Sequence, residues 1–270
     1  MALIVMVGDK GSPGVTTTSL AIAAVWPRRS LLAECDPHGG DLVYRLPAEN
    51  GGPLDPNRGL VSLAVSARRG LDPAALADHS QRIQGGLDVL VGLGNAEQTA
   101  GMAGLWGNLG RALDRYADYP HGADVIADCG RVGPDSPTLD LMPQAALVLV
   151  VGRSDAEQVA HVRDRVNGLS LRLHASQGSS TSVARPPIGV LLIAEPKSAR
   201  RVAGQVGELL SSTAAGAEVL GVIAHDPEGA AALNGRARSR VDKSLLVRSV
   251  RETVGNITRR YGLLHAGGLV

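Results

Sequence analysis

The stretch that decides the fold is residues 3–25, which read LIVMVGDKGSPGVTTTSLAIAAV. An apolar run is followed by a turn containing Gly11, Pro13 and Gly14, and then by a helix-forming segment that starts near Val15. The apolar run is continuous, as expected for a strand covered on both faces, and the glycines permit positive φ angles in the turn. The stretch therefore predicts a strand, a tight loop and a helix in direct succession.

This order is that of a phosphate-binding loop, in which backbone N–H groups and the N-terminal end of a helix face an anion. Thr16 and Thr17 place hydroxyls at the start of the helix, where they can contact Mg²⁺ and a phosphate. The general motif G-x-x-x-x-G-K-[ST] is not satisfied, because Val15 stands where a lysine would reach the phosphates and Pro13 lacks an N–H. We therefore expect a phosphate loop that lacks one of its cations.

The loop resembles the deviant Walker A box K-G-G-x-G-K-[ST]-[ST] of the ParA/MinD family of dimeric partitioning and positioning ATPases. Lys10 then takes the place of the signature lysine, which in that family reaches the nucleotide bound by the partner subunit. The chain has three lysines, Lys10, Lys197 and Lys243, so a chance match at this position is improbable. The resemblance implies an ATP or ADP site in which Lys10 also acts in catalysis, formed by Lys10, Gly11, Gly14, Val15, Thr16 and Thr17.

Carboxylates at two predicted strand ends extend the resemblance. Residues 31–41, LLAECDPHGGD, are similar to the family's strand followed by D-x-D-P-x-G, with Glu34 and Asp36 on the acidic positions. Asp128 ends another apolar run and matches the carboxylate of the Walker B strand. The resemblance implies that Thr16, Asp36 and Asp128 hold Mg²⁺ and that Asp36 orients the attacking water. Alternatively, Asp36 only begins a turn after the strand.

Apolar runs of strand length alternate with helical segments along the chain, which predicts one α/β domain over residues 1–270 with a doubly wound, mostly parallel sheet and helices on both faces. Strands are expected at 3–7, 30–35, 87–91, 125–128, 146–151, 188–193 and 219–224. Helices are expected at about 15–25, 72–79, 98–118, 154–169, 197–212 and 243–261, and loops at 49–59 and 174–187.

Composition sets further bounds on the protein. The formal net charge of +1 predicts no global attraction to nucleic acid or to an anionic membrane. No apolar run approaches the length of a membrane span, and we expect neither a signal peptide nor a transmembrane helix. Cys35 and Cys129 form no metal-binding spacing, which indicates a cytoplasmic protein. Both cysteines precede or follow a predicted site carboxylate, so we expect them to be close, as small buried residues rather than as a redox switch.

Basic residues gather in the C-terminal part of the chain. In ParA-like relatives such a surface binds DNA without sequence preference. Alternatively, these residues only form the solvated face of the last helix. The candidates for DNA contact are Arg236, Arg238, Arg240, Lys243, Arg248 and Arg251. A membrane anchor is disfavoured because Leu245, Leu246, Val250, Val254 and Ile257 have the spacing of a core-facing stripe.

Two functions of different classes follow. The first is a homodimerising switch that depends on ATP or ADP and Mg²⁺, engages DNA or a protein partner, and hydrolyses ATP slowly because Val15 replaces a phosphate-binding lysine. The second is a nucleotide-insensitive scaffold that localises pilus or secretion machinery, as in atypical relatives of the TadZ/CpaE type. Retention of Lys10, Thr16, Asp36 and Asp128 favours the switch. A metabolic enzyme of the same superfamily is a weaker third reading.

Overall fold

The computed structural model describes residues 2–11, 13–67, 71–174, 185–213, 215–236 and 240–263. Its sheet has eight strands in the order β3-β4-β2-β5-β1-β6-β7-β8, and every neighbouring pair is parallel except β3 and β4. The strands are β1 (Leu3–Gly8), β2 (Ser30–Glu34), β3 (Gln81–Arg82), β4 (Asp88–Leu90), β5 (Asp124–Arg131), β6 (Leu147–Arg153), β7 (Ile188–Ala194) and β8 (Glu218–Ala224). The predicted α/β class and mostly parallel sheet are confirmed.

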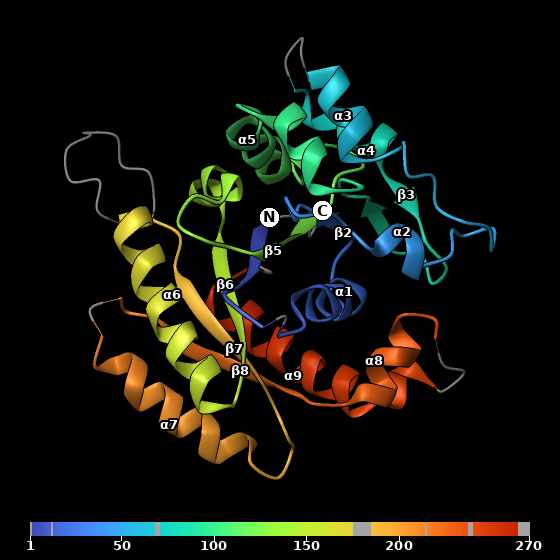
Figure 1. The fold of residues 1–270 in the computed structure, drawn as a ribbon. Helices are drawn as coiled ribbons and strands as arrows, with labels where there is room; N and C mark the ends of the chain where they lie inside the picture. Colours follow the sequence, from blue (N-terminus) through green and yellow to red (C-terminus); the bar gives the residue numbers. More distant parts are fainter. Residues whose placement is uncertain are drawn as a thin grey trace.

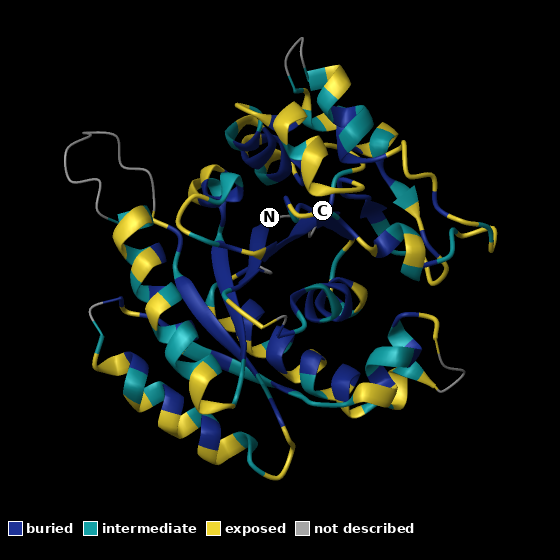
Figure 2. Ribbon diagram, in the orientation of Figure 1, coloured by how far each residue is buried: buried dark blue, intermediate teal, exposed yellow. Residues whose placement is uncertain are grey.

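Helices cover both faces of the sheet (Figure 1). On one face lie α3 (Leu60–Ala67), α4 (Leu76–His79), α5 (Trp106–Tyr116), α6 (Ala156–His174) and α7 (Ala199–Ser211). On the other lie α1 (Val15–Val25), α2 (Leu42–Arg45), α8 (Pro227–Leu233) and α9 (Leu245–Arg260). Figure 2 shows the buried sheet between these two layers. The central strands are buried on both sides, which explains their continuous apolar sequences.

Several elements differ from the sequence-based expectation. The predicted helix at 98–118 is split into a 3₁₀ segment, Ala96–Met102, and α5, because Gly104 between them adopts a φ of 73°. The short elements α2, α3, α8 and β3 were not expected. Leu245 was expected to face the core, but it is 48% exposed, whereas Leu246, Val250, Val254 and Ile257 are buried. Part of the predicted 174–187 loop, residues 175–184, lies outside the described residues.

No helix in the described ranges is long and apolar enough to cross a membrane.

Asp124 joins the N-terminal segment to the start of β5. Its buried carboxylate accepts hydrogen bonds from Ala2 N–H at 2.9 Å, Trp26 Nε1 at 2.7 Å and Arg28 Nε at 2.8 Å. These donors come from two places, the start of the chain and the turn after α1, so one side chain fixes the amino-terminal ends of the strands, opposite to the phosphate loop.

We predict that Asp124→Ala destabilises the protein by about 3 kcal/mol, because it leaves a partly buried cation and two buried N–H donors without their acceptor. The measurement is the urea unfolding midpoint, with exposed Asp135→Ala as the matched control. Equal midpoints for the two variants would contradict this role.

A candidate phosphate loop and carboxylate site at the ends of the central strands

The loop between β1 and α1 has the backbone geometry of an anion cradle. Gly11 and Gly14 adopt φ angles of 79° and 99°, in the left-handed region that favours glycine. Gly14 precedes the first turn of α1, which has no side-chain cap and no acidic residue. The N–H groups and positive dipole end of α1 are therefore left for another partner, and an anion is the partner they suit.

Val15, which stands in place of a phosphate-binding lysine, and Lys10, the loop's own lysine, lie in opposite environments. Val15 is 7% exposed and belongs to the core under α1. A Cβ added at Gly8 would come within 2.9 Å of Val15 Cγ2, which shows how closely the valine covers the end of β1. Lys10 is exposed and has no hydrogen bond or ion pair with any described residue. The loop therefore presents no cation from position 15, and its own lysine is directed to solvent.

Helix α6 holds the loop from the side. Arg165 donates to the Asp9 carboxylate through Nε at 2.7 Å and also through Nη2, and both side chains are largely buried. A Cβ at Gly11 would lie 2.5 Å from Nε2 of Gln158, so the Gln158 amide rests directly on the loop. Sequence reasoning missed these contacts, because nothing in the local pattern around Asp9 indicates a partner in α6.

Asp128 is a buried carboxylate at the loop's other side. It lies on β5, next to β1, and is 1% exposed. Its Oδ1 accepts from Gly130 N–H at 3.1 Å, whereas its Oδ2 is buried with no hydrogen-bond partner among the described residues. Burial raises the pKa of Asp128 to about 7, and the nearby Thr16 hydroxyl and the Gly130 N–H act in the opposite direction. An unpaired buried oxygen beside a threonine hydroxyl suits a hydrated cation.

Asp36 follows β2, the other neighbour of β5, and approaches the same place. Its Oδ1 accepts from His38 N–H at 2.8 Å. Its Oδ2 lies so close to Gly130 that a Cβ there would be 1.8 Å away, and Gly130 has a φ of 57°. The structure thus brings Asp36, Asp128 and Thr16 together at one edge of the sheet, as the sequence predicted. Their chemical roles stay predictions.

Glu34 does not lie on the surface of this site. It is 2% exposed, and its carboxylate accepts from the N–H groups of Asp41 at 2.7 Å, Leu42 at 3.0 Å and Gly92 at 2.9 Å. Burial raises the pKa of Glu34, and the three hydrogen bonds only partly offset this effect. Glu34 therefore braces the segment that carries Asp36, a role that sequence reasoning missed.

The two cysteines are neighbours, as expected. Cys35 and Cys129 follow paired residues on β2 and β5, and both are fully buried. A hydrogen bond to Cys35, together with burial, raises the pKa of the Cys129 thiol well above its usual value. Thiols in this state are poor nucleophiles, which agrees with a packing role.

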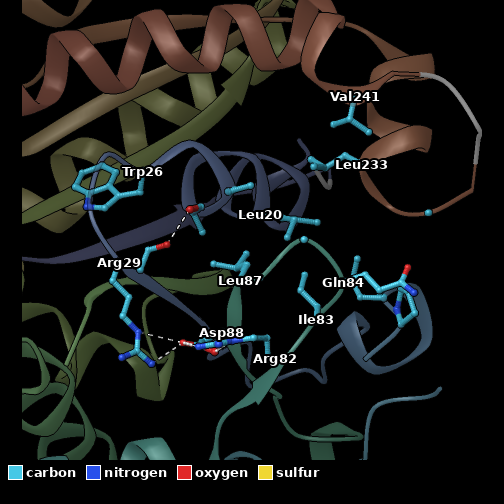
Figure 3. A pocket seen from close by; sticks show the side chains of 18 of the residues that line it. Leu20, Trp26, Arg29, Arg82, Ile83, Gln84, Leu87, Asp88, Leu233 and Val241 are labelled. Atoms are coloured by element: carbon cyan, nitrogen blue, oxygen red, sulfur yellow. Dashed lines mark hydrogen bonds and ion pairs between the residues drawn. The ribbon is translucent and has the colours of Figure 1, made fainter. Parts of the chain in front are cut away.

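A cavity of about 350 Å³ lies beside the loop. Gly14 and Thr17 form one wall, and Ile193 and His225, from the region of β7 and β8, form another. A second cavity, of about 590 Å³, lies between α1, the β3–β4 hairpin and the region after α8 (Figure 3). Its floor is apolar, and Arg29 and Arg82 at its rim both bind Asp88. None of the predicted site residues lines the second cavity, so the first is the candidate ligand site.

We predict that Asp128→Asn stabilises the protein at high pH in the absence of Mg²⁺ and nucleotide. Because the pKa of Asp128 rises from 3.8 to about 7 on folding, the folded protein retains a proton that the unfolded chain loses between these values. This group therefore lowers the free energy of unfolding as pH rises through that range. The gain in Tm over wild type should grow by several degrees from pH 5 to pH 8. The control is Asp135→Asn, whose effect on Tm should not depend on pH. A change in Tm for Asp128→Asn that is equally independent of pH would contradict the assignment.

Comparison with known proteins identifies the architecture. No protein-family model and no curated protein sequence matches the chain. Among solved structures, a ParA family ATPase from Chlorobium tepidum is similar with a TM-score of 0.68 and 16% identity, covering 94% of this chain and 98% of that one. The septum site-determining protein MinD from Pyrococcus horikoshii, complexed with Mg-ADP, gives a TM-score of 0.63 at 14% identity, with 97% and 98% covered.

A third similar structure is pNOB8 ParA bound to nonspecific DNA, with a TM-score of 0.63 and 16% identity over 98% of this chain and 100% of that one. The sequence identities are low, but each structural match covers nearly the whole of both chains. The chain therefore has the fold of the ParA and MinD ATPases.

Proposed function

We propose that this protein is an atypical member of the ParA/MinD family that binds ATP or ADP with Mg²⁺ and dimerises in response. The observation that carries this proposal is the unpaired, buried Oδ2 of Asp128 on β5, next to the strand that leads into the uncapped start of α1. The Asp128 carboxylate has no cation beside it, and the uncapped start of α1 has no anion. A metal–phosphate ligand meets both needs, and the MinD structure with Mg-ADP shows that a protein of this fold holds such a ligand.

Different residues of the chain would contact the phosphates, Mg²⁺ and the attacking water. Gly11 and Gly14 allow the backbone to approach the phosphates, and Thr17 lines the adjoining cavity. Thr16 and Asp128 would hold Mg²⁺, with Asp128 acting through water, and Asp36 would orient the attacking water from the end of β2. When bound, Mg²⁺ neutralises charge on the phosphate oxygens.

Lys10 is the residue we assign to the dimer. Its side chain is exposed and unpaired within the described part of the chain, so it is free to reach a nucleotide in a second protomer. Val15 explains why hydrolysis should be slow. Loss of one ammonium from a phosphate site costs a few kcal/mol of charge stabilisation in the transition state, which corresponds to about 100-fold or more in rate.

We predict that Mg·ATP binds by calorimetry and doubles the mass measured by light scattering, whereas Lys10→Ala binds ATP but stays monomeric. The matched control is Lys197→Ala, which removes another exposed lysine. Turnover at the rate of an ordinary P-loop ATPase that is unchanged in Lys10→Ala would contradict the switch. Absence of both heat and mass change would favour the alternative, a nucleotide-insensitive scaffold of the TadZ/CpaE type.

We further propose that α9 and the segment before it contact DNA or an acidic partner. The described members of the basic group are all exposed: Arg236, Arg240, Lys243, Arg248 and Arg251. Arg238 lies outside the described residues. Arg248 and Arg251 lie on α9, whose apolar face is buried, and the other three precede that helix. pNOB8 ParA is a protein of this fold whose structure was solved with nonspecific DNA.

We predict that Arg248→Ala combined with Arg251→Ala weakens binding to random-sequence duplex DNA and reduces the salt dependence of the affinity by about two phosphate contacts. Arg163→Ala together with Arg172→Ala on α6 is the control. Fluorescence anisotropy at several salt concentrations provides the measurement. Unchanged affinity and slope would show that the basic residues only form a solvated face.

A further inference from the structure

The cavity beside the phosphate loop is basic. Arg153 and Arg236 line it, and Asp226 is its one lining carboxylate among the described residues. That carboxylate is already occupied, because it accepts from Gly229 N–H at 2.9 Å and Leu246 N–H at 3.1 Å. The cavity therefore has two guanidinium groups against one carboxylate, and this excess of positive charge favours an anionic ligand.

Strand register places Arg153 next to the loop. Gly8, the last residue of β1, pairs with Val151 of β6, so Arg153 stands two residues beyond the level at which the chain leaves β1 to form the loop. Side chains two apart in a strand share a face. Val151 packs in the core on the α1 side, and Arg153 consequently points to the face where α1 begins.

Arg153 is also without a protein partner. It is partly buried at the end of β6, and it makes no hydrogen bond or ion pair with any residue in the described ranges. A guanidinium group held at a cavity wall beside Gly14 and Thr17, with no carboxylate to satisfy it, is suited to bind phosphate oxygens through two parallel N–H groups.

We propose that Arg153 binds the phosphates of the nucleotide from within the same chain and supplies the positive charge that Val15 does not. This inference rests on the proposed function, since it assigns a ligand contact at that site. Val15 cannot serve, because its side chain is buried in the core, and Lys10 is directed to solvent from the other end of the loop.

The test is calorimetric titration of wild type, Arg153→Ala and Arg153→Lys with Mg·ADP and with tripolyphosphate. Loss of a charge-assisted contact should weaken both ligands about 10- to 100-fold in Arg153→Ala, with partial recovery in Arg153→Lys. Arg163→Ala, which removes an exposed arginine of α6 paired with Asp164, is the control and should bind as wild type does. Tm should be unchanged in Arg153→Ala and Arg153→Lys, because Arg153 has no partner among the described residues.

If wild type binds both ligands and Arg153→Ala binds them equally well, the inference is wrong while the proposed function stands. If wild type binds neither ligand, the proposed function is wrong, and the inference about Arg153 is wrong with it. Weakened Mg·ADP binding with unchanged tripolyphosphate binding would place Arg153 on the nucleoside and would also overturn the assignment.

Discussion

The packing of Val15 beneath the phosphate loop is the constraint on which the site depends. An aliphatic side chain at this position is buried in the core with the end of β1, and it fixes the start of α1 without offering a charge. The loop retains its left-handed glycines and an uncapped helix end, so it keeps the neutral part of an anion site. In the proposed nucleotide site, positive charge would then come from elsewhere, and the described structure offers Lys10 at the solvent side and Arg153 at the cavity wall.

Two buried carboxylates at the adjoining strand ends differ in whether the fold itself supplies their hydrogen-bond partners. Glu34 and Asp128 are paired residues on β2 and β5, and both are almost completely buried. Glu34 accepts three backbone hydrogen bonds and is satisfied within the fold, whereas one oxygen of Asp128 has no partner among the described residues. A buried acceptor left unpaired is costly, and such costs are characteristic of ligand sites.

Much of the fold could be predicted from the sequence because its central strands are covered on both faces and read as continuous apolar runs. Helix α1 begins and ends where the pattern placed it. The short elements α2, α3 and β3 at the far edge of the sheet were missed, because they have too few turns or pairs to give a periodic signal. The extent of the domain stays a prediction.

The candidate site divides in the same way. Asp36, Asp128 and Thr16 could be proposed from the sequence because each follows a recognisable strand or loop motif, and their roles stay predictions. Arg165 and Arg153 could not, since a single arginine within or after an element carries no local pattern. Their relevance arises only from the packing of α6 on the loop and from the register between β1 and β6.

The most direct test of the central claim is a crystal structure of the protein with Mg²⁺ and a non-hydrolysable ATP analogue. The account predicts phosphate density against the backbone of Gly11 and Gly14, a metal beside the Thr16 hydroxyl, and a water between that metal and Asp128. Density for the analogue in the cavity between α1 and the β3–β4 hairpin, or an empty loop at saturating concentration, would contradict it.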